Sequence, residues 1–78
     1  MPEIEERLRK EINKWLPKAE EEFKKIKDCQ DKEFVTNIEA YIKDAYHFLE
    51  KEDLVLAFEC VIWSWAWMDI GKRKGILK

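Results

Sequence analysis

The chain has 78 residues, enough for one small domain whose single core is only just sufficient, and 41% of them are charged. A net charge of −2 argues against a polycation that would coat nucleic acid, and two glycines and two prolines leave little room for loops. The first residues, MPEIEERLRK, lack the pattern of an export signal, and the two cysteines lack CxxC spacing. We therefore expect a cytoplasmic protein with reduced thiols, and the many Lys and Glu residues are a balance often seen in thermophilic proteins.

An apolar stripe with helical spacing runs through the first third of the chain. Its members follow one another at intervals of three or four residues: Ile4, Leu8, Ile12, Trp15, Ala19, Phe23 and Ile26. Pro17 lacks a backbone N–H and clashes with the carbonyl of Asn13, which predicts a kink or a break near residues 13–17. Because the stripe keeps its phase across Pro17, we expect one kinked helix over about residues 3–28.

Two aspartates mark the starts of two further helices. The segment DCQDK, residues 28–32, reads as a turn in which Asp31 caps a second helix over about residues 32–51. Asp53 follows a tight turn and is expected to cap a third helix over about residues 54–70. Gly71 is expected to close that helix in a left-handed conformation, before a basic tail over residues 72–78.

The third predicted helix is the hydrophobic centre of the chain. Seventeen residues separate Asp53 from Gly71, and only Glu59 and Asp69 among them are charged. We predict an all-α fold, a three-helix up-down-up bundle with this apolar, Trp-rich helix at its centre. A membrane span is not favoured, because Glu59 lies near the middle of the segment and the other two helices need it as their core.

The predicted helices differ in length. At the helical rise, the first would be about 39 Å long and the other two only about 28 and 26 Å. The start of the first helix would then overhang, leaving Ile4, Leu8 and to a lesser degree Ile12 without cover. Either the kink at Pro17 folds this arm back or another chain covers it, which is a physical argument for self-association.

The segment Trp67–Gly75, WMDIGKRKG, resembles the W-L-D-A-G-x-R-x-G ending of domain-of-unknown-function family 357, a small archaeal family. The matching residues follow the family pattern in order: Asp53, Ala57, Trp67, Asp69, Gly71, Arg73 and Gly75. The resemblance covers roughly residues 19–77, and Glu52 stands where the family usually has glycine. It implies a helical bundle and no established activity.

The tryptophans offer one candidate surface. Around a helix Trp63 and Trp67 share a face, whereas Trp65 points nearly the opposite way. Trp65 is either part of the core and its boundary or an anchor for a partner or a second copy. We expect the interaction surface to comprise Ile4, Leu8, Trp15 and Trp65.

The end of the third helix offers a second candidate. Asp69 opposes the helix dipole there, so it either pairs with a following cation and folds the tail back, or belongs to a recognition patch. That patch would comprise Trp67, Asp69, Arg73 and Lys74. The basic residues either complement the dipole or contact RNA, with Trp67 stacking on a base.

Catalytic and metal-binding patterns are not expected in this sequence. His47 is the only histidine, and no nucleophile is placed beside it by spacing, so we expect a surface histidine and no cofactor. We expect a non-enzymatic protein-interaction or assembly module that associates with itself or with another protein. The alternative is an RNA-associated accessory protein that uses the basic tail.

Overall fold

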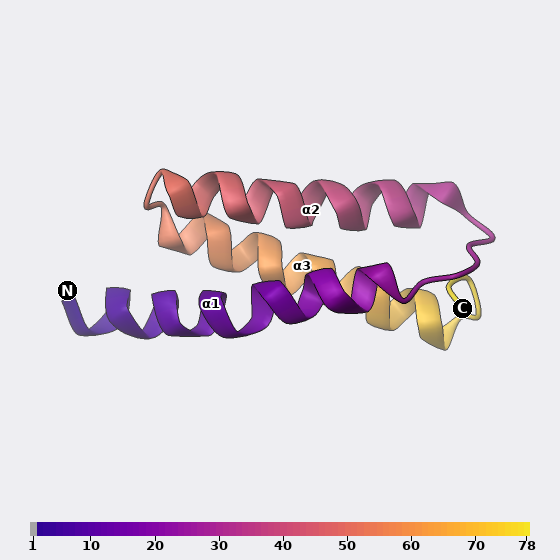
Figure 1. Ribbon diagram of the computed structural model, residues 1–78, viewed down its shortest axis with the longest axis horizontal. Helices are drawn as coiled ribbons and strands as arrows, with labels where there is room; N and C mark the ends of the chain where they lie inside the picture. Colours follow the sequence, from indigo (N-terminus) through magenta and orange to yellow (C-terminus); the bar gives the residue numbers. More distant parts are fainter. Residues whose placement is uncertain (1) are drawn as a thin grey trace.

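Residues 2–78, which the computed structural model describes, form three helices: α1 (Pro2–Lys24), α2 (Lys32–Glu50) and α3 (Leu54–Arg73). Figure 1 shows α2 and α3 as an antiparallel hairpin, with α1 lying alongside and running in the direction of α3. The molecule is elongated, with extents of 43 × 18 × 16 Å. The predicted all-α, up-down-up bundle is confirmed.

Aspartate caps begin both helices of the hairpin, as predicted. One carboxylate oxygen of Asp31 accepts a hydrogen bond from the backbone N–H of Glu33 at 3.0 Å. Asp53 accepts in the same way from the N–H of Leu56 at 3.2 Å. Each cap satisfies an N–H group that the first turn of a helix leaves without a partner.

A left-handed residue ends α2. Glu52 has φ of 61°, and its N–H donates to the carbonyl of Leu49 at 3.0 Å. The N–H of Asp53 donates to the carbonyl of Phe48 at 2.9 Å. These two bonds make a Schellman motif, in which glycine is the usual left-handed residue. Glu52 adopts the conformation although it carries a Cβ.

The end of α3 differs from the prediction. The helix continues to Arg73, and Gly75, with φ of 73°, is its left-handed residue. The N–H of Gly75 donates to the carbonyl of Lys72 at 3.1 Å, and the N–H of Ile76 to that of Gly71 at 2.8 Å. The assignment of the left-handed cap to Gly71 was therefore wrong. Gly71 lies inside α3, and its carbonyl accepts the hydrogen bond that closes the Schellman motif. The left-handed residue of such a motif comes four positions after that carbonyl, at Gly75.

Gly71 has a packing role instead. It lies buried inside α3, and a Cβ added there would lie 2.5 Å from Cδ1 of Leu77 and 3.2 Å from Cδ2 of Phe34. A real Cβ does not tolerate so short a distance to a neighbour. The glycine therefore makes room for the C-terminal leucine.

The predicted basic tail is part of the folded end of the bundle. The N–H of Lys27 donates to the carbonyl of Lys78 at 2.8 Å, and the N–H of Lys78 to that of Asp28 at 3.0 Å. The N–H of Gln30 donates to the carbonyl of Ile76 at 2.9 Å. Figure 1 shows the C-terminal coil against the α1–α2 connection, and Leu77 at its centre is only 3% exposed.

Helix α1 is shorter than predicted and runs unbroken through Pro17. It ends at Lys24, where the N–H groups of Lys25 and Ile26 donate to carbonyls three residues back. Its first turns extend beyond the α2–α3 turn (Figure 1). Ile4 is 54% exposed there, but Ile12 is fully buried, so the uncovered part of α1 is shorter than expected.

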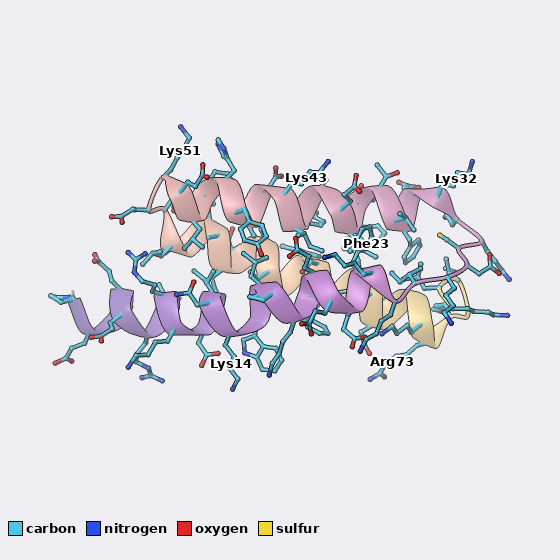
Figure 2. All side chains as sticks on the ribbon, in the orientation of Figure 1. Lys14, Phe23, Lys32, Lys43, Lys51 and Arg73 are labelled. Atoms are coloured by element: carbon cyan, nitrogen blue, oxygen red, sulfur yellow. The ribbon has the colours of Figure 1, made fainter. Side chains whose placement is uncertain are left out.

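The core lies along α3, which packs against both other helices, whereas α1 and α2 contact each other less. Buried side chains come from all three helices and the C-terminus: Ile12, Leu16, Ala19, Ile38, Ile42, Ala45, Leu54, Ala57, Val61, Met68 and Leu77. Figure 2 shows Phe23 between α1 and α2, and Lys14, Lys43 and Lys51 pointing away from the bundle. Because α3 has neighbours on two sides only, its third side is not covered by any part of residues 2–78.

Candidate interaction surface

Helix α3 carries apolar residues on its solvent side as well as on its core side. The large apolar side chains exposed there are between 38% and 59% accessible: Val55, Leu56, Ile62, Trp63 and Ile70. At about 100° per residue, they fall within a sector of about 120° that also holds Ala66 and the charged, exposed Glu59 and Arg73. We call the six apolar residues of this sector the α3 outer face.

An uncovered apolar face is unusual for a helix of a small domain. A helix that is apolar all round is expected to be buried on all sides, because water is a poor solvent for such a surface. The neighbouring helices leave the outer face open, and a gathering of exposed apolar side chains on one face marks a contact site. The geometry therefore indicates a binding surface.

Trp63 is the largest side chain on the α3 outer face. It is 53% exposed, and its ring stacks on Tyr41 of α2 with centroids 6.2 Å apart and an interplanar angle of 18°. Stacking fixes the orientation of the indole and leaves its outer side open, which suits an aromatic anchor. From the sequence, Trp63 was placed on the face of Trp67, and Trp65 on the opposite face was the candidate anchor. The sequence contains a second apolar stripe, in which residues recur every seven positions: Leu56, Trp63 and Ile70. This stripe was the signal that could have identified the exposed face of the helix.

Trp65, expected as a candidate anchor, is held by α1. It is half-buried, and its ring meets Trp15 edge to face with centroids 5.9 Å apart and an interplanar angle of 87°. Its Nε1–H donates to the backbone carbonyl of Trp15 at 3.2 Å. Trp65 thus joins two helices of the same chain.

Trp15 lies at the edge of this contact under charged neighbours. It is 37% exposed, and its Nε1–H donates to Glu11 at 2.9 Å. The ammonium groups of Lys14 and Lys18 lie 5.2 and 5.0 Å from its ring centroid, within cation–π range. Of the four predicted interaction residues, Trp15 and Trp65 therefore form one contact, which is separate from Ile4 and Leu8.

Ile4 and Leu8 lie apart from the two tryptophans, near the start of α1. With Arg7 and Glu11 they line a shallow pocket. Leu8 is half-buried against the core, and Ile4 is the more exposed of the two. This end of α1 offers a smaller apolar surface than the α3 outer face.

The predicted recognition patch is not brought together. Trp67 is half-buried, and its ring meets Phe34 of α2 edge to face with centroids 4.8 Å apart. Asp69 and Arg73 lie about 160° and 120° around the helix from Trp67, on the solvent side. Lys74 is the C-cap residue of α3.

Ion pairs engage the acidic and basic residues near the end of α3. Arg73 Nε lies 3.0 Å from Asp69 Oδ2, so Asp69 pairs within its own helix. Lys72 Nζ lies 2.9 Å from Glu22 Oε2 and thereby joins α3 to α1. Hydrogen bonds from Lys72 and Lys25 hold the pKa of Glu22 below its ordinary value. These residues tie the helix ends together.

The remaining chemistry-bearing side chains are dispersed over the described part of the chain. Cys29 and Cys60 are free thiols, and partial burial together with Asp44 and Glu59 raises the pKa of Cys60. Between residues 2 and 78, no group of three His, Cys, Asp or Glu side chains is placed to hold a metal ion. His47 is exposed on α2.

By length and composition, α3 is also apolar enough to cross a membrane. One third of its most apolar 18-residue window is buried inside the bundle. A single helix of this kind is weak evidence for a membrane span, because the core helix of a soluble protein meets the same criteria. Glu59 lies on its outward side, where a membrane would have to accommodate the charge.

Comparison with known proteins identifies a protein family and a solved structure that match the chain. Residues 5–77 match the model of a family described as protein of unknown function, DUF357. A crystal structure of a protein from Archaeoglobus fulgidus, assigned to the same family model, is 55% identical and superimposes with a TM-score of 0.90. The match covers 96% of each chain. A search of the curated proteins gave no match.

Proposed function

The chain belongs to the DUF357 family, and we propose that it is a small, non-enzymatic interaction or assembly module that associates with itself through the α3 outer face. The supporting observation is that five large apolar side chains are exposed on one face of α3, whose other faces pack against α1 and α2. Apolar surface removed from water contributes about 25 cal/mol per Å² to association. Binding is the role that such a surface serves.

The dimensions of the surface suit a contact between domains. From Val55 to Ile70 the helix rises about 22 Å. A stable interface needs about 800 Å² from each partner, and the whole described chain exposes 5685 Å². An interface of that size would take about one seventh of the surface, and the α3 outer face with its rim provides the apolar centre.

The RNA-associated role stays a prediction from the sequence, with less support. It needs Trp67 free to stack on a base and the cations free to contact phosphate. Trp67 packs against Phe34, and Arg73 and Lys72 are both ion-paired with carboxylates. The cytoplasmic location and the lack of a cofactor likewise stay predictions.

Two matched substitutions test which surface is used. Ile62 on the α3 outer face is 51% exposed, and Ile4 at the start of α1 is 54% exposed. We expect light scattering on a size-exclusion column, at micromolar concentration and two salt levels, to show a dimer for the wild type and for Ile4→Lys. Ile62→Lys should be a monomer, because it places a charge in the apolar contact.

Circular dichroism of each variant checks that the helices are retained. A monomeric wild type would contradict self-association. Loss of the dimer in Ile4→Lys but not in Ile62→Lys would assign the contact to the overhanging part of α1 instead.

A further inference from the structure

The solvent side of α3 carries a sequence pattern that reads the same in both directions. Five residues follow at intervals of three, four, four and three: Glu59, Ile62, Ala66, Ile70 and Arg73. At about 100° per residue they all fall within a sector of about 80°. An isoleucine stands on each side of Ala66, and the two ends carry opposite charges.

We infer that two copies of the chain pair through antiparallel α3 helices, about a two-fold axis that passes beside Ala66. This inference rests on the proposed function and specifies the partner and the register. An axis at Ala66 places Ile62 of each copy opposite Ile70 of the other, and Glu59 opposite Arg73. A two-fold interface uses the same patch twice, so a self-complementary pattern is what it requires.

A parallel arrangement and a shifted antiparallel register both lack this complementarity. A parallel pair would place Glu59 beside Glu59 of the other copy. An antiparallel pair with its axis two residues earlier, at Ser64, would place Glu59 opposite Asp69. Like charges held together oppose association, whereas the axis at Ala66 brings a carboxylate to a guanidinium in both halves.

The charges on this face support the same pairing. Glu59 is exposed, and it makes no ion pair within residues 2–78, although it stands among apolar side chains. Arg73 pairs with Asp69, and its side chain is 78% exposed, so further N–H donors are free for a second carboxylate. In the dimer each Arg73 lies between Asp69 of its own helix and Glu59 of the other copy.

Side-chain size fits a close crossing of the two helices. Ala66 is small, so the helix axes approach at the centre of the contact, within the usual separation of 8–10 Å. Trp63, oriented by its stacking on Tyr41, lies at one edge of the seam. There it covers the flank of the second α3 and excludes water from the contact.

Charge reversal tests the pairing directly. Glu59→Arg alone brings cations together, and Arg73→Glu alone brings carboxylates together, so we expect each to weaken the dimer at least tenfold. An equimolar mixture of the two variants should form a heterodimer, since every facing pair is then opposite in charge. The double variant E59R/R73E should restore the homodimer. Lys43→Glu, on the outward side of α2, should have no effect.

Disulfide trapping tests the register. In a Cys29→Ser, Cys60→Ser background, Ala66→Cys should crosslink to itself under mild oxidation, because a disulfide needs Cα atoms within about 7 Å. Ile62→Cys should crosslink with Ile70→Cys in a mixture but form little homodimer on its own.

The outcomes separate the two proposals. A wild-type dimer that ignores the charge reversals would overturn the antiparallel register and leave self-association standing. A wild-type monomer would overturn both, and binding of that monomer to phosphatidylcholine vesicles would assign the α3 outer face to a membrane. Restoration of dimer only in the mixture and in the double variant supports the register at Ala66.

Discussion

Glu52 holds a position at which the backbone favours glycine. Its φ of 61° is left-handed, and a residue with a Cβ loses roughly 1 kcal/mol there. Its carboxylate lies 3.6 Å from the Arg9 guanidinium, but both side chains are exposed, so this pair contributes at most about 1 kcal/mol. Two effects of similar size therefore act at one residue.

Substituting Glu52 separates them. Glu52→Ala removes the ion pair and keeps the Cβ, whereas Glu52→Gly removes both. We expect Glu52→Gly to exceed Glu52→Ala in free energy of unfolding by about 0.5–1 kcal/mol, because only glycine relieves the left-handed conformation. Urea unfolding measures the difference. A glycine variant less stable than the alanine variant would contradict the strain at this turn.

The contact between Gly71 and Leu77 gives a second prediction at the residue scale. Gly71→Ala should lower the free energy of unfolding by about 1–3 kcal/mol, since its Cβ meets Leu77 and overpacking outweighs the gain in helix propensity. In a Leu77→Ala background, the same substitution should become neutral or stabilising.

Gly75→Ala provides the comparison for this prediction. It has open space around it but φ of 73°, so it should cost about 1 kcal/mol in both backgrounds. Urea unfolding of the three single variants, including Leu77→Ala, and of the two double variants checks the coupling. A Gly71→Ala cost that persists without Leu77 would contradict the packing role of this glycine.

The residue roles that were predicted correctly from the sequence depend on interactions between near neighbours in the chain. Asp31 and Asp53 cap helices through bonds to residues two or three positions away, so their neighbours in the chain suffice. Gly71 follows the apolar run directly and was taken as its cap. Its role is decided by Leu77, which returns only after a left-handed turn at Gly75 and pairing with the α1–α2 connection. No local signal announces that return.

At the scale of the elements, α1 and α3 are joined by the Trp15–Trp65 pair. We expect Trp65→Ala to lower the free energy of unfolding by about 2–4 kcal/mol, because Trp65 is half-buried and packs on α1. Trp65→Phe, which loses only the indole N–H donor and some area, should cost about 1 kcal/mol. We would measure both Trp65 substitutions by urea unfolding in an Ile62→Lys background, in which we expect no dimer to add to the stability.

Trp63→Ala is the matched control for Trp65→Ala. Trp63 is 53% exposed and contacts Tyr41 on one side only, so its removal should cost less than the removal of Trp65. In the wild-type background, Trp63→Ala should instead weaken association. A larger loss of free energy of unfolding for Trp63→Ala than for Trp65→Ala would show that the roles of the two tryptophans are exchanged.

Glu22 and Lys72 form another link between α1 and α3, and we expect its contribution to stability to depend on pH. Because Lys72 and Lys25 lower the pKa of Glu22 in the folded state, the stability that it adds is present above the unfolded value near 4.5. That stability is lost as the pH falls through the folded pKa. We expect Glu22→Gln to be less stable than the wild type at pH 7, and the difference to shrink below about pH 4.5.

Urea unfolding of both proteins from pH 7 to pH 3 tests this dependence. Lys72→Met, which removes the partner that acts most strongly on Glu22, should reduce the same difference. A difference between wild type and Glu22→Gln that stays constant across this range would contradict the ion pair as its source.

Helical periodicity predicted the elements but not which side of α3 stays open. It placed Trp65 opposite Trp63 and Trp67, which is correct around a helix. It did not show where the neighbouring helices lie. In the structure, α1 covers the side of α3 that carries Trp65, and α2 covers the side that carries Trp67. Trp63 lies nearer the side of α3 that neither helix covers. Packing between segments distant in the chain decided this outcome.

At the scale of the whole molecule, the two ends of the chain differ in how much they contribute to the fold. Residues 2–7 are all exposed and extend past the α2–α3 turn (Figure 1). Residues 76–78 pair with the α1–α2 connection and bury Leu77. Unequal helix lengths predicted the overhang, whereas the tail appeared in the sequence as a short basic segment without periodicity.

Deleting one end or the other should therefore have effects of very different size. Removing residues 2–7 should change the free energy of unfolding by less than about 1 kcal/mol and leave the dimer intact, because no buried side chain is lost. Removing residues 76–78 should cost more than about 2 kcal/mol, since the side chain of Leu77 and the backbone pairing are both lost. Urea unfolding and light scattering on both truncated chains test this. Loss of the dimer on removing residues 2–7 would show that the overhang, rather than the α3 outer face, holds the two copies together.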